Sequence, residues 1–565
     1  MSLLSSLQIA NNSLLTSQLG LQVVGNNIAN ANTPGYIRQQ LNLASTEPQK
    51  YGDLTIGLGV TVTGITQQID KFLEERLRNA TSDVANGEAQ ESVYSQLEAI
   101  IGELGDTDLS TSLSKFFNSI HDILNQPESV SVRNIAVLQG QTLTQDIALL
   151  NRRVQDVRVQ VNSQVSAAAD DINSLLEKIA ELNVKIVQTE GGSVSKSDAV
   201  GLRDARGERL KELAGILDIK TQEQATGDVT VFVNGEYLIS AGQYREVAAL
   251  TKSDRGLNVA EIRLVATDSP IQSASGKLAG LINARDTILG GFLDELNSFT
   301  GVLINEFNKA YSRGQGLTGF SSIKSESAVT STTAALDQAG LNFTPVNGSF
   351  QIKVLNKQTG LTTTKNITVN LDGFDDDTSL ESLVSQLDAV EGLTATIDDN
   401  RRLLVDADFS NLSFSFADDT SGVLAALGVN TFFSGHNGTD ISVSSTLLSD
   451  PSKFAASQGG VGEDAHNAEQ LATLLSSRLS TQNGQSLAVL YDRLTSNVSQ
   501  GASVIKSVAE GYRTFQSALD GQHLAISGVS IDEEAVRMIG YQRTFQASAK
   551  LISTISELLD LLVNL

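Results

Sequence analysis

Apolar residues recur with the spacing of a helical seam at both ends of this chain. Near the C-terminus five of them fall at intervals of seven, and the seam positions between them include the polar exceptions Glu534 and Ser548. Seams of this kind are buried lengthwise on another helix, so we expect the two terminal helices to pair as a coiled coil. The predicted assembly seam comprises Leu7, Leu14, Leu21 and Ile28 with Ile531, Met538, Phe545, Ile552 and Leu559.

The periodicity alone leaves a second arrangement open, in which each terminal helix packs on a different face of an ordinary core. Both helices carry local signals for their ends. Thr33-Pro34-Gly35 stops the first helix, because proline disfavours helical backbone in the preceding residue and glycine permits a turn. Ser530 and Glu533 have the spacing of a capping box at the start of the second helix.

The N-terminal helix has an unusual polar face. From Met1 to Ile37 there is no Asp, Glu, Lys or Arg, and the positions off the seam are mostly Asn, Ser, Gln and Thr. A helix that faces water usually carries charged residues there, and Asn, Ser and Thr are mediocre helix formers. We therefore expect a helix that is marginal alone and is covered on several sides by neighbours, as an assembly element would be.

Composition limits the classes of function. The net charge of -25 disfavours nucleic acid and anionic membrane surfaces as partners, because both need basic patches. The chain has no cysteine, which excludes disulfides, thiolate zinc sites and cysteine nucleophiles. We find no Sec-type signal peptide and no apolar stretch of membrane-spanning length, which by itself would suggest a cytosolic protein.

The middle of the chain alternates between helical and strand periodicity, which predicts an α+β multidomain protein. One helix is predicted from about Val130 to Val187, and Asn234-Gly235 marks a β-hairpin turn. Strand alternation returns in the second half, at Phe350–Val354, Asn366–Leu371, Leu393–Ile397, Leu403–Val405 and Leu412–Phe416. The expected domains are a terminal coiled coil (1–45 and 525–565), a helical stem (46–215, 270–320 and 463–524), a small β-rich insertion (216–269) and an outer β-rich domain (321–462).

Nothing in the sequence predicts a catalytic, cofactor-binding or metal site. None of the four histidines, His121, His436, His466 and His523, has a second His or Cys at ligand spacing. The acidic stretch Asp372–Asp377 fails the spacing of a calcium loop and is interpreted as a solvated turn. Gly314–Gly319 matches G-x-G-x-x-G but follows a helix rather than a strand, so nucleotide binding is rejected.

Several motifs resemble one known family. The run Asn26–Gln40 is similar to the N-terminal signature of the bacterial flagellar rod, hook and hook-associated proteins, and Ser527–Leu565 to their C-terminal signature. Leu202–Ala214 resembles a D-x-R-x-x-L-x-x-L helix of the hook-associated members. Leu303–Tyr311 with its following glycines resembles another of their motifs, with tyrosine where the family often has histidine. The resemblance covers most of the chain except about 320–460, a region that is similar to an insertion module of flagellins.

The resemblance implies a non-enzymatic subunit that polymerises at the distal end of the hook and forms the hook-filament junction. The implied partners are the chain itself, hook protein, a second hook-associated junction protein and an export chaperone on the C-terminal helix. The implied location is the extracellular flagellum, reached by type III export without a cleaved signal. Alternatives are a hook or rod subunit, or an exported cell-wall hydrolase. No cofactor is implied.

The signature residues have two interpretations. Amide side chains can hydrogen-bond at or between subunits without bringing charge, which favours a role in assembly. The alternative is that they only end the helix and form a turn. The predicted signature residues are Asn26, Asn27, Asn30, Asn32, Thr33, Pro34, Gly35 and Tyr36. We also expect the terminal helices to become ordered only when the subunit docks.

Overall fold

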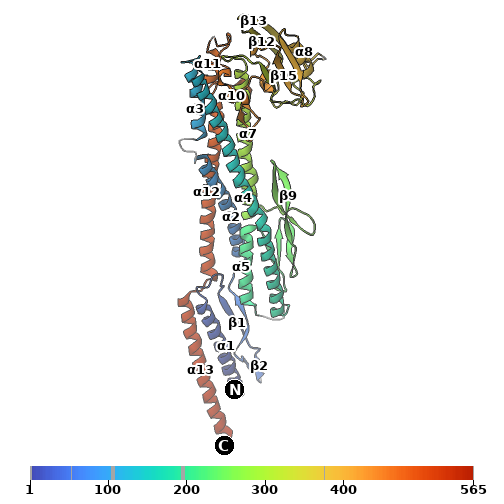
Figure 1. Ribbon diagram of the computed structural model, residues 1–565. Helices are drawn as coiled ribbons and strands as arrows, with labels where there is room; N and C mark the ends of the chain where they lie inside the picture. The colour runs from blue at the N-terminus through green and yellow to red at the C-terminus, as the bar shows by residue number, and fades with distance from the viewer. Residues whose placement is uncertain are drawn as a thin grey trace. The chain divides into compact units, whose positions relative to one another are not determined.

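The computed structural model describes residues 3–51, 54–102, 108–192, 197–374, 376–462 and 464–563 (Figure 1). Asp375 of the acidic turn and the last residues of the C-terminal motif, 564–565, lie outside this range. The chain forms two compact units. The first contains the residues up to Val93, Val159–Asp286 and the residues from Ser503 onward; the second contains Tyr94–Arg158 and Thr287–Ala502.

The chain termini meet in the first unit, as the coiled-coil prediction required. Helix α1 (Leu3–Ala29) packs along α13 (Ile531–Val563), which confirms the predicted pairing of the terminal helices. A β-ribbon follows α1, in which β1 (Gln39–Ser45) pairs antiparallel with β4 (Val60–Gln67). Its extension is the short hairpin of β2 (Gln49–Tyr51) and β3 (Leu54–Ile56).

Two small sheets complete the first unit. A four-stranded sheet has the order β5-β6-β7-β8, and β9 pairs with β10. The predicted hairpin turn is confirmed between β6 and β7, where Asn234 and Gly235 both have positive φ. The bounds are β5 (Lys220–Glu223), β6 (Val229–Val233), β7 (Glu236–Ser240), β8 (Gln243–Tyr244), β9 (Val247–Asp254), β10 (Leu257–Leu264), α5 (Val200–Ile216) and α6 (Lys277–Asn283).

Three long helices contribute residues to both units. They are α2 (Lys71–Gly102), α4 (Val130–Glu190) and α12 (Leu487–Ser527). The bounds of α4 confirm the helix predicted from about Val130 to Val187. Its apolar stripe is buried, since Val154, Val165 and Ile172 have no exposed surface. No helix among the described residues is long and apolar enough to cross a bilayer.

An aromatic cluster forms the core of the second unit. Phe116 of α3 (Leu109–Ile123) and Phe307 of α7 (Gly290–Tyr311) meet with ring centroids 5.3 Å apart, and both contact Phe432. A π-helical turn, η2 (Ala284–Leu289), follows α6 directly and leads into α7. The smaller elements are β17 (Phe433–Ser434), β18 (Ser442–Val443), α10 (Ser445–Ser449), η3 (Pro451–Lys453), α11 (His466–Thr473) and η4 (Ser480–Gln482).

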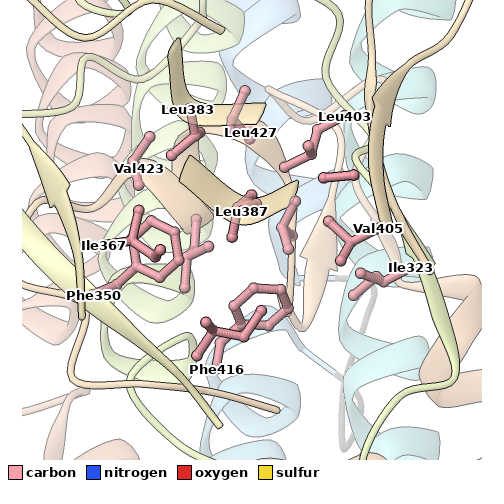
Figure 2. Packing of buried hydrophobic residues seen from close by; sticks show 14 of the residues in the cluster. Ile323, Phe350, Ile367, Leu383, Leu387, Leu403, Val405, Phe416, Val423 and Leu427 are labelled. Carbon is pink, nitrogen blue, oxygen red and sulfur yellow. The ribbon is translucent and has the colours of Figure 1, made fainter. Parts of the chain in front are cut away.

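The β-rich segment of the second unit has a core of its own, and we call residues 320–429 the outer module. Figure 2 shows that its two sheets and two short helices point their apolar side chains into one cluster. The strands predicted in this segment are confirmed. The sheets have the orders β13-β12-β16 and β11-β15-β14. The bounds are β11 (Ser322–Lys324), β12 (Gly348–Asn356), β13 (Thr362–Val369), α8 (Leu380–Asp388), β14 (Leu393–Ile397), β15 (Leu403–Ala407), β16 (Leu412–Ala417) and α9 (Val423–Leu427).

Candidate functional site: the paired chain termini

The contact between α1 and α13, which we call the terminal pair, is built from small and polar side chains. Ser13 of α1 meets Ser548 of α13, whose hydroxyl donates to the Ser13 hydroxyl at 2.9 Å. Tyr541 lies over Gly20, where no side chain separates the ring from the helix backbone. Small residues at a helix interface allow the two backbones to come close, so this pair packs tightly without large apolar knobs. The buried residues of α1 are Ala10, Thr16, Ser17, Gly20, Val23, Val24 and Asn27.

Gly20 offers a direct test of this close packing. A Cβ at position 20 would lie 2.5 Å from the Tyr541 ring, whereas a Cβ at Gly25 would meet nothing within 4 Å. We expect Gly20→Leu to destabilise the terminal pair by about 1–3 kcal/mol through overpacking. Gly25→Ala should instead be neutral or stabilising by up to about 1 kcal/mol, because alanine is the better helix former. Hydrogen exchange of residues 3–29 in the assembled state measures both changes, and equal effects of the two would contradict the packing.

The predicted apolar seam lies beside this contact rather than at its centre. On α13 the fully buried positions are Glu534, Ser548 and Ile555, of which the first two are the polar exceptions of the sequence pattern. Ile531 is 52% exposed. The remaining seam residues are half-buried along both helices, namely Leu7, Leu14, Leu21, Ile28, Met538, Phe545, Ile552 and Leu559.

Asn27 connects the end of α1 to the strand that follows it. Its side-chain amide donates to the Gln39 carbonyl at 3.0 Å and accepts from the Gln39 N–H at 3.0 Å. Its Oδ1 also accepts from the Tyr36 hydroxyl at 2.8 Å, and its Nδ2 donates to Glu534 at 3.0 Å. Asn27 is fully buried, and its bonds to Gln39 and Glu534 are shielded from water, whereas the bond from Tyr36 is part-buried. This residue therefore fixes both the chain reversal after α1 and the register of α1 on α13.

A buried ion pair completes the network. Arg38 donates from Nε and Nη2 to Oε1 of Glu534, at 2.9 and 2.6 Å, and Glu534 has no exposed surface. Nη2 also pairs at 2.8 Å with Glu533, whose side chain is 62% exposed. Burial opposes the charge on Arg38, but the bonds to Glu534 and Glu533 outweigh it and raise the pKa of the guanidinium. Periodicity did not predict Arg38 as a site residue, although a carboxylate inside an apolar seam signals a buried cation.

The other signature residues form the loop that follows α1, here called the signature loop (residues 30–38). Asn30 Nδ2 donates to the Asn26 carbonyl at 3.0 Å, and the Thr33 hydroxyl donates to Asn30 Oδ1 at 3.2 Å. Gly35 has a φ of +76°, and a Cβ there would meet the Glu208 side chain. The side chains of Asn26, Asn32, Thr33 and Pro34 are exposed. Within one chain, then, Asn26 and Asn30 serve the turn, while Asn27 and Arg38 bond across to Glu534 of α13.

A cleft of about 640 Å³ lies between the signature loop, α2, α5 and the end of α12. Burial raises the pKa of Asp204 on its α5 wall to about 6, despite the bond from Gln67. Opposite, His523 of α12 contacts Glu74 of α2 at 2.6 Å. No group of three or more His, Cys, Asp or Glu side chains suited to a metal ion occurs among the residues that the structure describes. The cleft borders the Gly528–Ser530 link between α12 and α13, where the Arg38 N–H donates to the Ser527 carbonyl at 2.9 Å.

The contact between His523 and Glu74 predicts a pH dependence. The Glu74 carboxylate raises the pKa of His523 above its usual 6.5. A histidine pKa that is higher in the folded than in the unfolded state adds stability, which is fully present below the unfolded pKa of about 6.5. This added stability is lost as the pH rises through the pKa of the folded state. We expect His523→Gln to lower the free energy of unfolding by on the order of 1 kcal/mol at pH 6 and to have no effect at pH 9. Unfolding curves at both pH values measure this, and an effect that grows with pH would contradict it.

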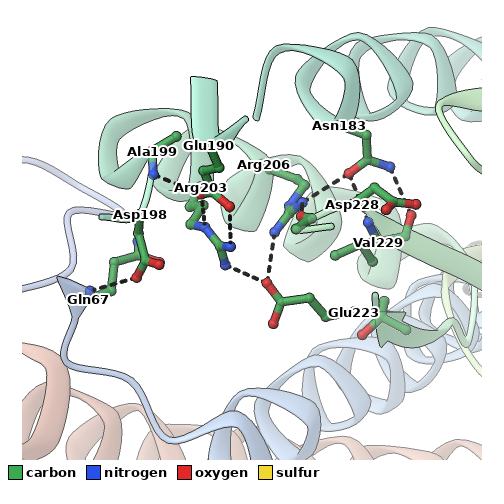
Figure 3. Close-up of polar contacts among 12 residues, drawn as sticks. Gln67, Asn183, Glu190, Asp198, Ala199, Arg203, Arg206, Glu223, Asp228 and Val229 are labelled. Carbon is green, nitrogen blue, oxygen red and sulfur yellow. Dashed lines mark hydrogen bonds and ion pairs between the residues drawn. The ribbon is translucent and has the colours of Figure 1, made fainter. Parts of the chain in front are cut away.

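The α5 wall of the cleft is held by an ion-pair network shown in Figure 3. Arg203 donates to both carboxylate oxygens of Glu190, at 2.7 and 2.9 Å, and also pairs with Glu223. Arg206 donates at 3.0 Å to Asn183, whose amide in turn bonds Val229 of β6. Outside that network, Gln67 of β4 donates its backbone N–H to Asp198, just before α5, and its side-chain amide to Asp204 of α5. These contacts make α5 a support for the ribbon that leads to the terminal pair.

Comparisons with known proteins agree with these motifs. A family model described as the helical domain of flagellar hook-associated protein FlgK matches residues 94–323. Two further models match the ends, a flagellar basal body rod FlgEFG protein C-terminal model at 521–565 and a flagella basal body rod protein model at 7–36. The two ends of the chain and residues 94–323 therefore all match models of flagellar proteins.

Similar whole proteins point the same way. Flagellar hook-associated protein 1 of Escherichia coli (strain K12) is 24% identical over 98% of both chains. Its namesake in Bacillus subtilis (strain 168) is 24% identical over 99% of this chain and 97% of the relative. Among solved structures, the flagellar hook junction protein FlgK from Burkholderia pseudomallei superposes with a TM-score of 0.50 at 14% identity, over 80% of this chain and 100% of that one. With the terminal pair and its signature loop in place, the chain is similar to flagellar hook-associated protein 1 along nearly its whole length.

Proposed function

We propose that this chain is a non-enzymatic structural subunit that polymerises at the distal end of the flagellar hook and forms the junction on which the filament assembles. The observation that carries the proposal is the terminal pair, in which Asn27, Arg38 and Glu534 join the two ends of the chain. Similarity to hook-associated protein 1 over 98% of the chain supports the position at the junction. Head-to-tail addition of such subunits gives a helical tube.

The surface of the terminal pair supports an assembly role. α1 carries no charged residue, yet Leu4 and Leu15 are 68% and 50% exposed. On α13, Val536 and Leu561 are 71% and 62% exposed. Exposed apolar side chains along both helices favour further packing partners, so we propose that the predicted seam and signature residues contribute contacts to neighbouring subunits as well.

The same proposal includes a route of export and a set of partners for this chain. The chain leaves the cell unfolded by type III export without a cleaved signal, and a chaperone shields its C-terminal helix beforehand. Its contacts in the flagellum are further copies of itself, hook protein and a second hook-associated junction protein. The division into a terminal coiled coil, a helical stem and two β-rich insertions remains part of this proposal.

The experiment that tests this function is electron microscopy of cells that lack the gene, with flagellin assayed in the medium. We expect hooks without filaments and flagellin lost to the medium. Absent or truncated hooks would instead place the chain among hook or rod subunits. Normal flagella would overturn the proposal, and wall-degrading activity of the purified chain would favour an exported hydrolase.

Docking should also complete the folding of α1. Asn, Ser and Gln on its open face give it little intrinsic helix stability, and that face is exposed in the part of the chain that the structure describes. We expect weak hydrogen-exchange protection of residues 3–29 in the free subunit and strong protection in isolated flagella. Strong protection already in the free subunit would contradict coupled folding, and residues 154–172 of α4 provide the protected reference in both samples.

A further inference from the structure

The outer module presents exposed aromatic and aliphatic side chains at both ends of one β-hairpin. Strand β12 and its neighbour β13 run antiparallel, so the residues before β12 and after β13 lie at one end and the connecting turn lies at the other. Nine residues of β12 separate the two ends by roughly 30 Å at the rise of an extended strand. Because the hairpin is held by the core in Figure 2, its two ends have a fixed separation.

One end, which we call the acidic end, comprises Val346, Asp372, Phe374, Asp376 and Asp377. Phe374 and Val346 are 74% and 57% exposed. Asp377 Oδ1 accepts from the backbone N–H groups of Asp372 and Gly373, at 2.9 and 3.1 Å, which gives the loop a defined shape. The sequence from 371 to 377 contains four aspartates and no basic residue.

The opposite end, which we call the basic end, comprises Lys357, Leu361, Lys365 and Phe409, whereas Lys353 lies within β12 and donates to the Gly459 carbonyl at 3.5 Å, outside the outer module. Leu361 and Phe409 are 71% and 66% exposed. The sequence from 353 to 365 contains three lysines and no acid. The turn is closed by the Gly360 N–H, which donates to the Asn356 carbonyl at 2.8 Å, and the Lys357 N–H bonds Asn411 beside Phe409 at 2.8 Å.

Two acids lie next to the basic end, Asp408 and the exposed Glu391, whose neighbour Gly392 accepts at its carbonyl from the Asp408 N–H at 3.0 Å. Asp408 precedes Phe409, but its carboxylate accepts from the Thr394 hydroxyl at 2.7 Å. Lys357 reaches the Ser410 carbonyl at 3.3 Å on the same side, which brings its ammonium next to Phe409. The two ends therefore each combine an exposed aromatic ring with an aliphatic side chain, and they differ in the sign of the charge around the ring.

We propose that the acidic end docks on the basic end of a second copy of this chain. Each end gathers two exposed apolar side chains among charged ones, and apolar patches with a polar rim mark interaction sites. The two patches carry opposite charges, so each patch binds the other more favourably than it binds a copy of itself. Because the two patches lie at opposite ends of one rigid hairpin, the contact is heterologous and continues from copy to copy, which gives a ring or a helix rather than a dimer. This contact rests on the proposed function in one respect, because assembly is what places copies of the chain side by side.

Cysteine cross-linking tests the contact in flagella, because the chain has no cysteine of its own. We expect the full-length chain carrying both Leu361→Cys and Phe374→Cys to form a ladder of disulfide-linked copies in isolated flagella under mild oxidation. Each single variant should give no cross-link. The matched control replaces Phe374→Cys with Ser385→Cys, on the exposed face of α8, and should give no ladder. Self-linking of either single variant, or no ladder from the pair, would overturn the proposal.

Charge exchange supplies a second measurement on the same chain. Starting from the cysteine pair, Lys357→Glu or Asp376→Lys alone should lower the cross-linked fraction by about tenfold, since like charges then face each other. The two together restore opposite charges and should restore the ladder. A charge exchange without effect would overturn the proposal. If the chain is detected at the hook tip but gives no ladder, the contact is wrong and the proposed function stands. If purified chain gives a ladder but never enters flagella, the contact stands and the proposed function is wrong.

Discussion

Glu534→Ala is expected to abolish incorporation of the chain into flagella, so that the variant accumulates in the medium. The carboxylate is fully buried and neutralises Arg38, whose side chain is 7% exposed. Removal of one partner from a buried ion pair typically costs about 3–5 kcal/mol, because the other charge stays buried without compensation. Asn27 also loses the acceptor that ties it to α13. The amounts of chain in sheared flagella and in the medium, measured by immunoblot, check the expectation.

The control for this variant lies one residue earlier. Glu533 also pairs with Arg38 but is 62% exposed, so Glu533→Ala should cost about 0–1 kcal/mol and leave incorporation unchanged. Removal of both buried charges, with Arg38→Met and Glu534→Met, should recover part of the loss because no isolated charge remains. If Glu534→Ala entered flagella as well as Glu533→Ala does, the buried pair would have no role in assembly.

Periodicity predicted those parts of the fold that depend on local sequence. The pairing of the terminal helices and the long helix α4 follow from a repeat near 3.5 residues, which any single stretch reveals by itself. The hairpin at Asn234-Gly235 follows equally from two residues that tolerate positive φ. These predictions needed no knowledge of what each element packs against.

The centre of the terminal pair could not be predicted in this way. Glu534 and Ser548 interrupt an apolar pattern, and only the structure shows that Arg38 and Ser13 come from the other end of the chain to meet them. Gly20 is likewise ordinary in the sequence until Tyr541 is seen against it. Contacts between residues about 500 positions apart are set by tertiary packing, which a single sequence does not encode in any local period.

The ion-pair network behind α5 has the same origin. Glu190 ends α4, Arg203 lies in α5 and Glu223 ends β5, so three elements supply one cluster (Figure 3). The sequence indicated a helix with an acid and an arginine at 202–214, but it did not indicate which carboxylates bind that helix. Arg203 is the centre of the cluster because it hydrogen-bonds both Glu190 and Glu223.

Arg203→Met is therefore expected to lower the stability of the α5 region by about 3–5 kcal/mol at pH 7, as breaking a largely buried pair does. Arg209→Met on the same helix should change it by less than about 1 kcal/mol, because its pair with Glu212 is exposed. Hydrogen exchange of residues 200–216 and 220–233 measures both, since unfolding of the whole chain need not be two-state. Equal protection in the two variants would contradict the central position of Arg203.

Acid should remove the difference between these variants. Burial alone would raise the pKa of Glu190, but the bonds from Arg203 and the Ala199 N–H outweigh it and lower the pKa. Glu223 is likewise lowered, against burial, by Lys71 and Arg203. A carboxylate pKa that is lower in the folded than in the unfolded state adds stability above the unfolded pKa of about 4.5. This added stability is lost as the pH falls through the pKa of the folded state. Wild type and Arg203→Met should therefore converge in protection as the pH falls below about 4, whereas a difference that persisted or grew in acid would show that Arg203 stabilises this region by packing rather than by charge.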